Sequence, residues 1–80
     1  MVIKILAFGI AKEILGSNLV ELDVADNATI GDLKLHLSQR FPALGQLSSF
    51  MLSINSEYAS LSDTIYWGDE VAIIPPVSGG

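Results

Sequence analysis

The alternation of apolar and polar residues predicts strands near the start of the chain. Residues 2–8 are rich in strand-forming types and give a first strand. A lysine rarely faces a core, so Lys4 marks the outer face of this strand, and Leu6 and Phe8 share that face with it. Residues 19–24 also alternate, and they predict a second, half-buried strand.

Helical spacing of apolar residues predicts one main helix in the middle of the chain. Thr29 and Asp32 have the spacing of a capping box at its start, and Pro42 ends it. A shorter helical turn is predicted at residues 10–15, where Gly16 stops it. The apolar stripe of the main helix consists of Ile30, Leu33, Leu37 and Phe41.

Short strands follow the helix. Residues 50–55 and 57–59 predict two strands around a turn at Asn55 and Ser56, and a further turn leads into a final strand that ends at residue 74. The order of strand, strand, helix and strands indicates the α+β class. We expect a β-grasp (ubiquitin-like) roll at residues 1–74, in which one main helix packs on one face of a mixed sheet. An extended tail follows at residues 75–80.

Composition narrows the classes of function. Half of the residues are hydrophobic and 16% are charged, which is typical of a folded domain with apolar surface to spare. The net charge of -5 would repel the phosphates of nucleic acid and favours a partner with a basic face. No segment is long enough to span a membrane, and the absence of cysteine favours a reducing compartment. We therefore expect a cytoplasmic protein whose partners are proteins, with no role for nucleic acid or membrane.

The predicted body offers no set of residues that could carry out catalysis. His36 is the only histidine, and no second ligand for a metal stands near it in sequence. Asp63, Asp69 and Glu70 cluster in sequence, but a turn residue and a charge at a strand edge explain the last two more simply than an acid–base pair does. Neither a nucleophile elbow nor a phosphate-binding loop is present. We expect this chain to bind no metal or cofactor and to run no reaction alone.

The last six residues, PPVSGG, predict an extended arm. Pro75 and Pro76 lack backbone donors and fix φ, so the sheet must stop before them. At about 3.3 Å per extended residue the arm spans roughly 20 Å, enough to enter a neighbour's active site. Gly79 and Gly80 have no Cβ, so a narrow tunnel would admit the tip. The alternative is an inert, frayed terminus.

The chemistry of such a tip depends on activation by another protein. With a pKa of about 3.5, a terminal carboxylate is an anion at neutral pH and a poor electrophile. If a partner that uses ATP converted the Gly80 carboxylate into an acyl adenylate, a sulfur donor could attack it. The chain has no cysteine whose thiolate would intercept that species.

Two segments resemble a known family. Residues 68–80 resemble the C-terminal signature of the ubiquitin-like sulfur carriers of molybdenum cofactor biosynthesis, which form the small subunit of molybdopterin synthase, and residues 6–16 resemble their N-terminal segment. The resemblance implies a cycle of three partners. An E1-like enzyme uses ATP to adenylate Gly80, a sulfur donor converts it to a thiocarboxylate, and the large subunit passes the sulfur to a cyclic pyranopterin precursor to build the dithiolene. The catalytic residues would then belong to the large subunit.

The resemblance also implies roles for the residues of the tail. Gly80 would carry the sulfur as the reacting acyl group, and Gly79 would be the adjacent residue, which has no side chain to obstruct a narrow channel. The residues that would position the tail are Pro75, Pro76, Val77 and Ser78.

Strand parity predicts where the large subunit docks. If the first and last strands pair, Ile74 lies on the outer face beside Phe8, and with Tyr58 they form an apolar patch at the root of the tail. The resemblance adds a charged contact through Lys12, which stands where the family often has arginine. The alternative remains open, because singly exposed apolar residues are normal on protein surfaces.

Other functions share the same body plan. A sulfur carrier for thiamine biosynthesis also ends in Gly-Gly but usually lacks the Pro-Pro pair. A ubiquitin-like protein modifier would be joined through Gly80 to lysines of its targets. A plain interaction module would leave the tail inert.

Overall fold

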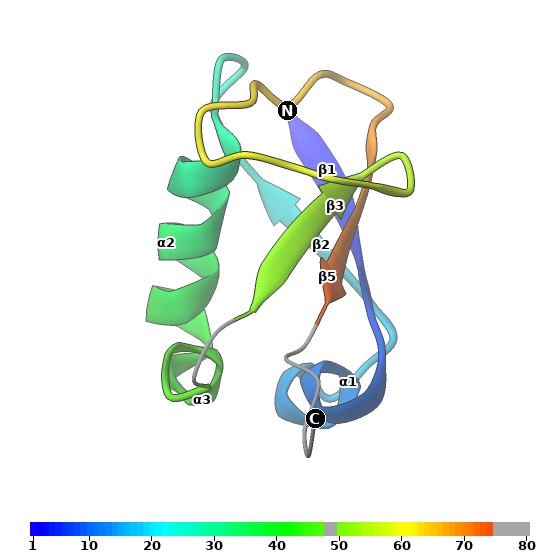
Figure 1. Cartoon of the computed structure of the whole chain (residues 1–80), viewed down its shortest axis with the longest axis vertical. Coiled ribbons are helices and arrows are strands. Elements are labelled where there is room, and N and C mark those ends of the chain that lie inside the picture. Colours follow the sequence, from blue (N-terminus) through cyan, green and yellow to red (C-terminus); the bar gives the residue numbers. More distant parts are fainter. Residues whose placement is uncertain (48–49, 75–80) are drawn as a thin grey trace.

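A five-stranded mixed sheet forms the framework of the computed structural model, which describes residues 1–47 and 50–74 (Figure 1). The strand order is β2-β1-β5-β3-β4, in which β1 and β5 are parallel and the other pairs are antiparallel. This sheet and its covering helix confirm the predicted β-grasp architecture. The elements are β1 (Val2–Ala7), α1 (Gly9–Leu15), β2 (Leu19–Asp23), α2 (Ile30–Arg40), α3 (Pro42–Gly45), β3 (Met51–Ile54), β4 (Glu57–Tyr58) and β5 (Glu70–Ile74).

The pairing of β1 with β5 confirms the predicted parity of both strands. Leu6 lies opposite Ala72 and Ala7 opposite Ile73. Ala7 and Ile73 are fully buried on the inner face, whereas Leu6 on the outer face is only half-buried. Because the two strands run in the same direction, β5 ends at the same end of the molecule as α1 (Figure 1).

The helix α2 covers the inner face of the sheet. Thr29 accepts a hydrogen bond from the Asp32 backbone, and the Asp32 carboxylate accepts one from the Thr29 backbone, so the predicted capping box is confirmed. Such a box satisfies two backbone donors that the helix itself leaves free. The helix residues that are fully or almost fully buried are Ile30, Leu33 and Leu37.

The segment after α2 differs from the sequence prediction. Pro42 does end α2, but it also begins the short helix α3, because proline fits the first turn, where its missing N–H would be unbonded anyway. Phe41, predicted on the buried stripe, lies between the two helices and is half-buried. Leu44 of α3 is fully buried and closes one end of the core. The sequence pattern predicts no helix in this segment.

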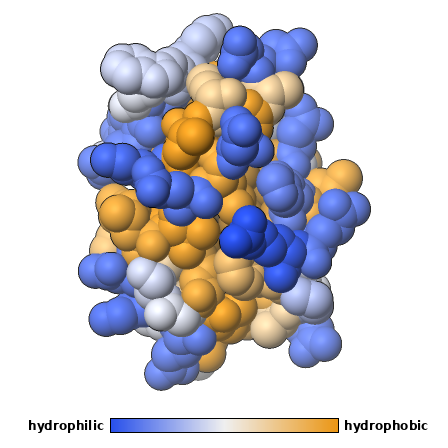
Figure 2. Space-filling view, turned by 180° about the vertical axis from the view of Figure 1, so that it is seen from behind, coloured by the Kyte–Doolittle hydropathy of each residue, from blue (hydrophilic) through white to orange (hydrophobic). Residues whose placement is uncertain are grey.

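Apolar side chains are not confined to the core. Several half-buried apolar residues pack against its rim, among them Ile14 of α1 and Val20 of β2. Seen from behind, apolar side chains occupy much of the middle of the surface, with several polar side chains across it and more along its margins (Figure 2). Among the described helices, none has the length and apolar character needed to cross a bilayer.

Candidate functional site

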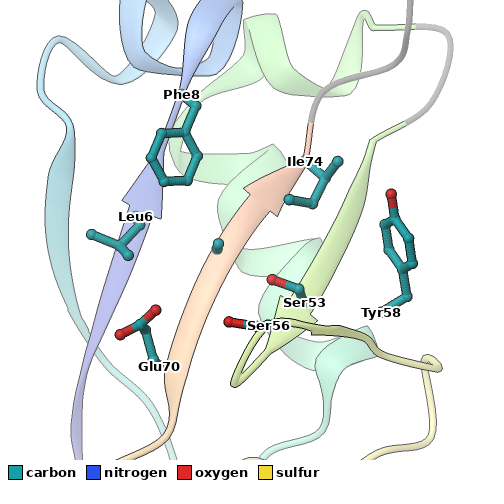
Figure 3. Close-up of a pocket in the computed structure, with 8 residues that line it drawn as sticks. Leu6, Phe8, Ser53, Ser56, Tyr58, Glu70 and Ile74 are labelled. Carbon is teal, nitrogen blue, oxygen red and sulfur yellow. The ribbon is translucent and has the colours of Figure 1, made fainter.

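A shallow hollow of about 320 Å³ lies on the outer face of the sheet, on the side away from α2 (Figure 3). Small-molecule and cofactor pockets commonly measure roughly 300 to 1,000 Å³ and enclose most of their ligand. This hollow stands at the lower limit and is open, so it suits a few side chains of another protein better than a cofactor. Its lining residues come from β1, β3, β4, β5 and the β3–β4 turn, and they are Leu6, Phe8, Ser53, Ser56, Tyr58, Glu70, Ala72 and Ile74.

One end of the hollow is apolar. Phe8 follows β1 and is 53% exposed, Tyr58 of β4 is 68% exposed, and Ile74 is the last residue of β5. Figure 3 shows Phe8 and Ile74 facing one another across the end of the sheet, with Tyr58 along the side. The structure thus brings together three residues that the sequence analysis predicted as a patch. The last described strand, β5, ends at this apolar end.

The opposite end of the hollow is polar, and the sequence analysis did not assign a role to its residues. Figure 3 shows Glu70 and Ser56 at this end and the hydroxyl of Ser53 on the floor. The sequence alone predicts for Glu70 only a charge at a strand edge. The alternation of side chains along β5 could have identified this position, because Glu70 is two residues before Ala72 and therefore lies on the same outer face.

The side chain of Asn55 links the β3–β4 turn to β5 at this polar end through hydrogen bonds. Its amide nitrogen donates to the Asp69 carboxylate at 3.1 Å, and its amide oxygen accepts from the Glu70 backbone at 2.9 Å. The Asn55 backbone N–H also donates to the Glu70 carbonyl at 2.8 Å. Asn55 therefore ties the β3–β4 turn to the start of β5 and places Ser56 beside Glu70.

The backbone of this turn has the conformation that the sequence favours. Asn55 and Ser56 have φ angles of 52° and 71°, as the two central residues of a tight hairpin turn require. Asp69 accepts a hydrogen bond from the Tyr66 backbone at 2.8 Å, and Gly68 has a φ of 88°. Asp69 is therefore a turn residue, as predicted, and not a member of an acid–base pair.

The remaining predicted residues lie elsewhere. Lys12 is exposed on α1 and is not among the residues that line the hollow, so its partner contact stays a prediction. His36 is half-buried on α2. Asp63 accepts a hydrogen bond from the Ser60 backbone at 2.8 Å, as a turn residue does. Within residues 1–47 and 50–74, no three histidine, aspartate or glutamate side chains come close enough to hold a metal ion.

The predicted tail lies outside the described residues. The roles assigned to it therefore remain predictions. These residues are Pro75, Pro76, Val77, Ser78, Gly79 and Gly80.

Comparisons with known proteins identify related chains. The model of the ThiS family matches residues 5–80. The chain is 37% identical to the molybdopterin synthase sulfur carrier subunit of Chlamydomonas reinhardtii, with 100% of both chains covered. It is 39% identical to small archaeal modifier protein 1 of Haloferax volcanii, over 85% of this chain and 88% of that protein. The crystal structure of small archaeal modifier protein 1 from that organism superposes with a TM-score of 0.84, at 32% identity and full coverage of both chains. These matches confirm the fold and the family resemblance expected from the sequence.

We predict that Asn55→Gly lowers the free energy of unfolding by about 1 kcal/mol, because glycine keeps the turn conformation but loses both side-chain hydrogen bonds. Urea unfolding measures this change. Ser56→Gly is the matched control, since it relieves a positive φ without removing the link to β5 and should leave stability unchanged or raised. Equal stability of Asn55→Gly and the native chain would show that the link contributes nothing.

Proposed function

The chain belongs to the ThiS family, and on that premise we propose that it is the sulfur carrier subunit of a molybdopterin synthase. The observation that carries the proposal is the exposed apolar lining of the hollow, in which Phe8 and Ile74 flank the end of β5 and Tyr58 lies along the side. In this proposal, a partner that covers this end also binds the C-terminal residues that follow Ile74. The likeness over full length to a protein named as such a subunit supports the same role.

The reacting group in this proposal is the carboxylate of Gly80. An E1-like enzyme joins it to the AMP part of ATP with release of pyrophosphate, and a sulfur donor then displaces AMP to leave a thiocarboxylate. The large subunit transfers that sulfur to the pyranopterin precursor. Gly79 and Gly80 lack Cβ atoms, so the carbonyl is open to attack and the tip fits a narrow channel.

In this chemistry the chain presents its C-terminal tail and provides the surface that the partners recognise. Among the described residues, the hollow is lined by apolar side chains, Tyr58, two serines and the Glu70 carboxylate. We assign the catalytic groups, and the binding of ATP, to the partners. Pro75, Pro76, Val77 and Ser78 position the tail by limiting its backbone freedom and by contacts in the channel.

The large subunit docks on the outer face of the sheet in this proposal. Exposed aromatic and aliphatic side chains are the usual anchors of protein interfaces. Phe8 and Tyr58 expose more than half of their surfaces although the inner face has a full core, so they are available to a partner. Lys12 on α1 is the proposed charged contact beside this face.

A role as a protein modifier is the second candidate, because small archaeal modifier protein 1 is 39% identical to this chain. Both roles begin with adenylation of the tail. They differ in the product, since a modifier forms isopeptide bonds with lysines and a carrier gains sulfur in place of oxygen.

Replacing Phe8 with glutamate should weaken binding of the large subunit by at least about tenfold, because it puts a charge into the centre of an apolar contact. Isothermal titration calorimetry measures the affinity, and thermal unfolding should change little because Phe8 is half exposed. Leu35→Glu is the matched control: Leu35 is 61% exposed on α2, away from the hollow, and its replacement should leave binding unchanged. Equal affinity of Phe8→Glu and the native chain would contradict the proposed docking face.

Deletion of Gly80 should abolish molybdopterin formation in a reaction containing the large subunit, the activating enzyme, ATP and a sulfur donor. The deletion variant should still bind the large subunit within about threefold, because the hollow is intact. Mass analysis of tagged protein from cells distinguishes the two candidate roles: a carrier shows replacement of oxygen by sulfur, and a modifier shows a ladder of lysine conjugates. Full activity of the deletion variant would refute the role of Gly80.

A further inference from the structure

We infer that the polar end of the hollow binds an arginine side chain of the large subunit. In this arrangement the guanidinium lies between the Glu70 carboxylate and the hydroxyls of Ser53 and Ser56, and its methylene stem lies along Leu6 and Ala72. The inference rests on the proposed function, because it names a contact within the docking face.

The carboxylate of Glu70 forms no salt bridge with the described residues. Lys4 lies directly opposite Glu70 in the β1–β5 register, and both residues are on the outer face. Despite this position, no ion pair joins them or any other side chains in the described part of the chain. Lys4 instead lines a separate hollow with Trp67 and Asp69. The carboxylate of Glu70 lines the main hollow (Figure 3), and no basic side chain of the described residues forms a salt bridge with it.

The hydroxyl of Ser53 lines the same end of the hollow. Ser53 is 6% exposed, and Figure 3 shows its hydroxyl directed into the hollow at the end occupied by Ser56 and Glu70. A hydroxyl both donates and accepts hydrogen bonds, so this one is available to a group that enters the hollow from outside.

The hydrogen-bond acceptors at the polar end match the hydrogen-bond donors of a guanidinium. A guanidinium has five N–H donors in one plane, so it can bond a carboxylate through two of them and hydroxyl oxygens through others. An ammonium is a compact point charge without that planar spread. The groups at this end are a carboxylate and two hydroxyls, all of which accept hydrogen bonds, and the net charge of -5 favours a cationic partner group.

Apolar side chains line the hollow between its apolar end and its polar end. Leu6 is half-buried and Ala72 is 9% exposed, and both line the hollow midway along β1 and β5. Long cationic side chains pack their methylene groups along apolar surface while the charged head reaches polar groups. The turn that carries Ser56 is held in place by Asn55, so the polar end is formed before the partner arrives.

The test compares the affinity of the large subunit for Glu70→Gln and Glu21→Gln variants by calorimetry. Both changes remove one negative charge, and Glu21 also lies opposite Lys4, but on β2 and outside the hollow. We expect Glu70→Gln to raise Kd at least about tenfold and Glu21→Gln to change it less than about twofold. The Kd of Glu70→Gln should also depend less on salt than that of the native chain.

Two outcomes would overturn the inference, and they are distinguishable. Native-like affinity of Glu70→Gln, with Phe8→Glu still weakened, would remove the arginine contact but leave the proposed function intact. Equal weakening by Glu70→Gln and Glu21→Gln would show a general effect of charge on this face and would refute a specific contact. If the native chain did not bind the large subunit at all, the inference would fail together with the proposed function.

Discussion

The parallel pairing of β1 with β5 is the constraint on which the rest of the structure depends. It joins the first and last described strands in the centre of the sheet and sets their register, with Leu6 opposite Ala72. Since side chains alternate along each strand, this register decides which residues face the helix and which face outward. A slip of β5 by one residue would turn Val71 and Ile73 out to solvent and direct Ala72 and Ile74 towards the core.

The two faces of the sheet divide stability from recognition. The inner face supplies the buried branched and aliphatic side chains that pack on α2 and α3. No helix of the described residues lies over the outer face, which exposes Phe8 near the end of β5 and Tyr58 on β4. A domain of 80 residues buries a smaller share of its surface than a larger one, so leaving an apolar face exposed to water lowers its stability further. Binding of a partner to this face during part of a reaction cycle would explain why the face is apolar.

Much of this arrangement could be predicted from the sequence, because it follows from local rules. Alternation gave the faces of β1 and β5, the Thr29–Asp32 spacing gave the start of α2, and Asn55 marked the hairpin turn. The short helix α3 was missed because Pro42 signals the end of one helix and the start of another equally well. The polar end of the hollow was missed because it depends on contacts between segments. Asn55 and Glu70 lie fifteen positions apart, and no local pattern shows that they are joined.

The central claim is that another protein recognises the outer face of the sheet at the end of β5. Chemical-shift mapping by NMR tests it most directly, with the isotope-labelled chain titrated with the unlabelled large subunit. We expect the largest changes on Phe8 and on outward residues of β1, β3 and β5, with Ser53 and Ala72 among them, and little change on the exposed side of α2 around Leu35. Changes centred on α2, with β1 and β5 unaffected, would contradict the account.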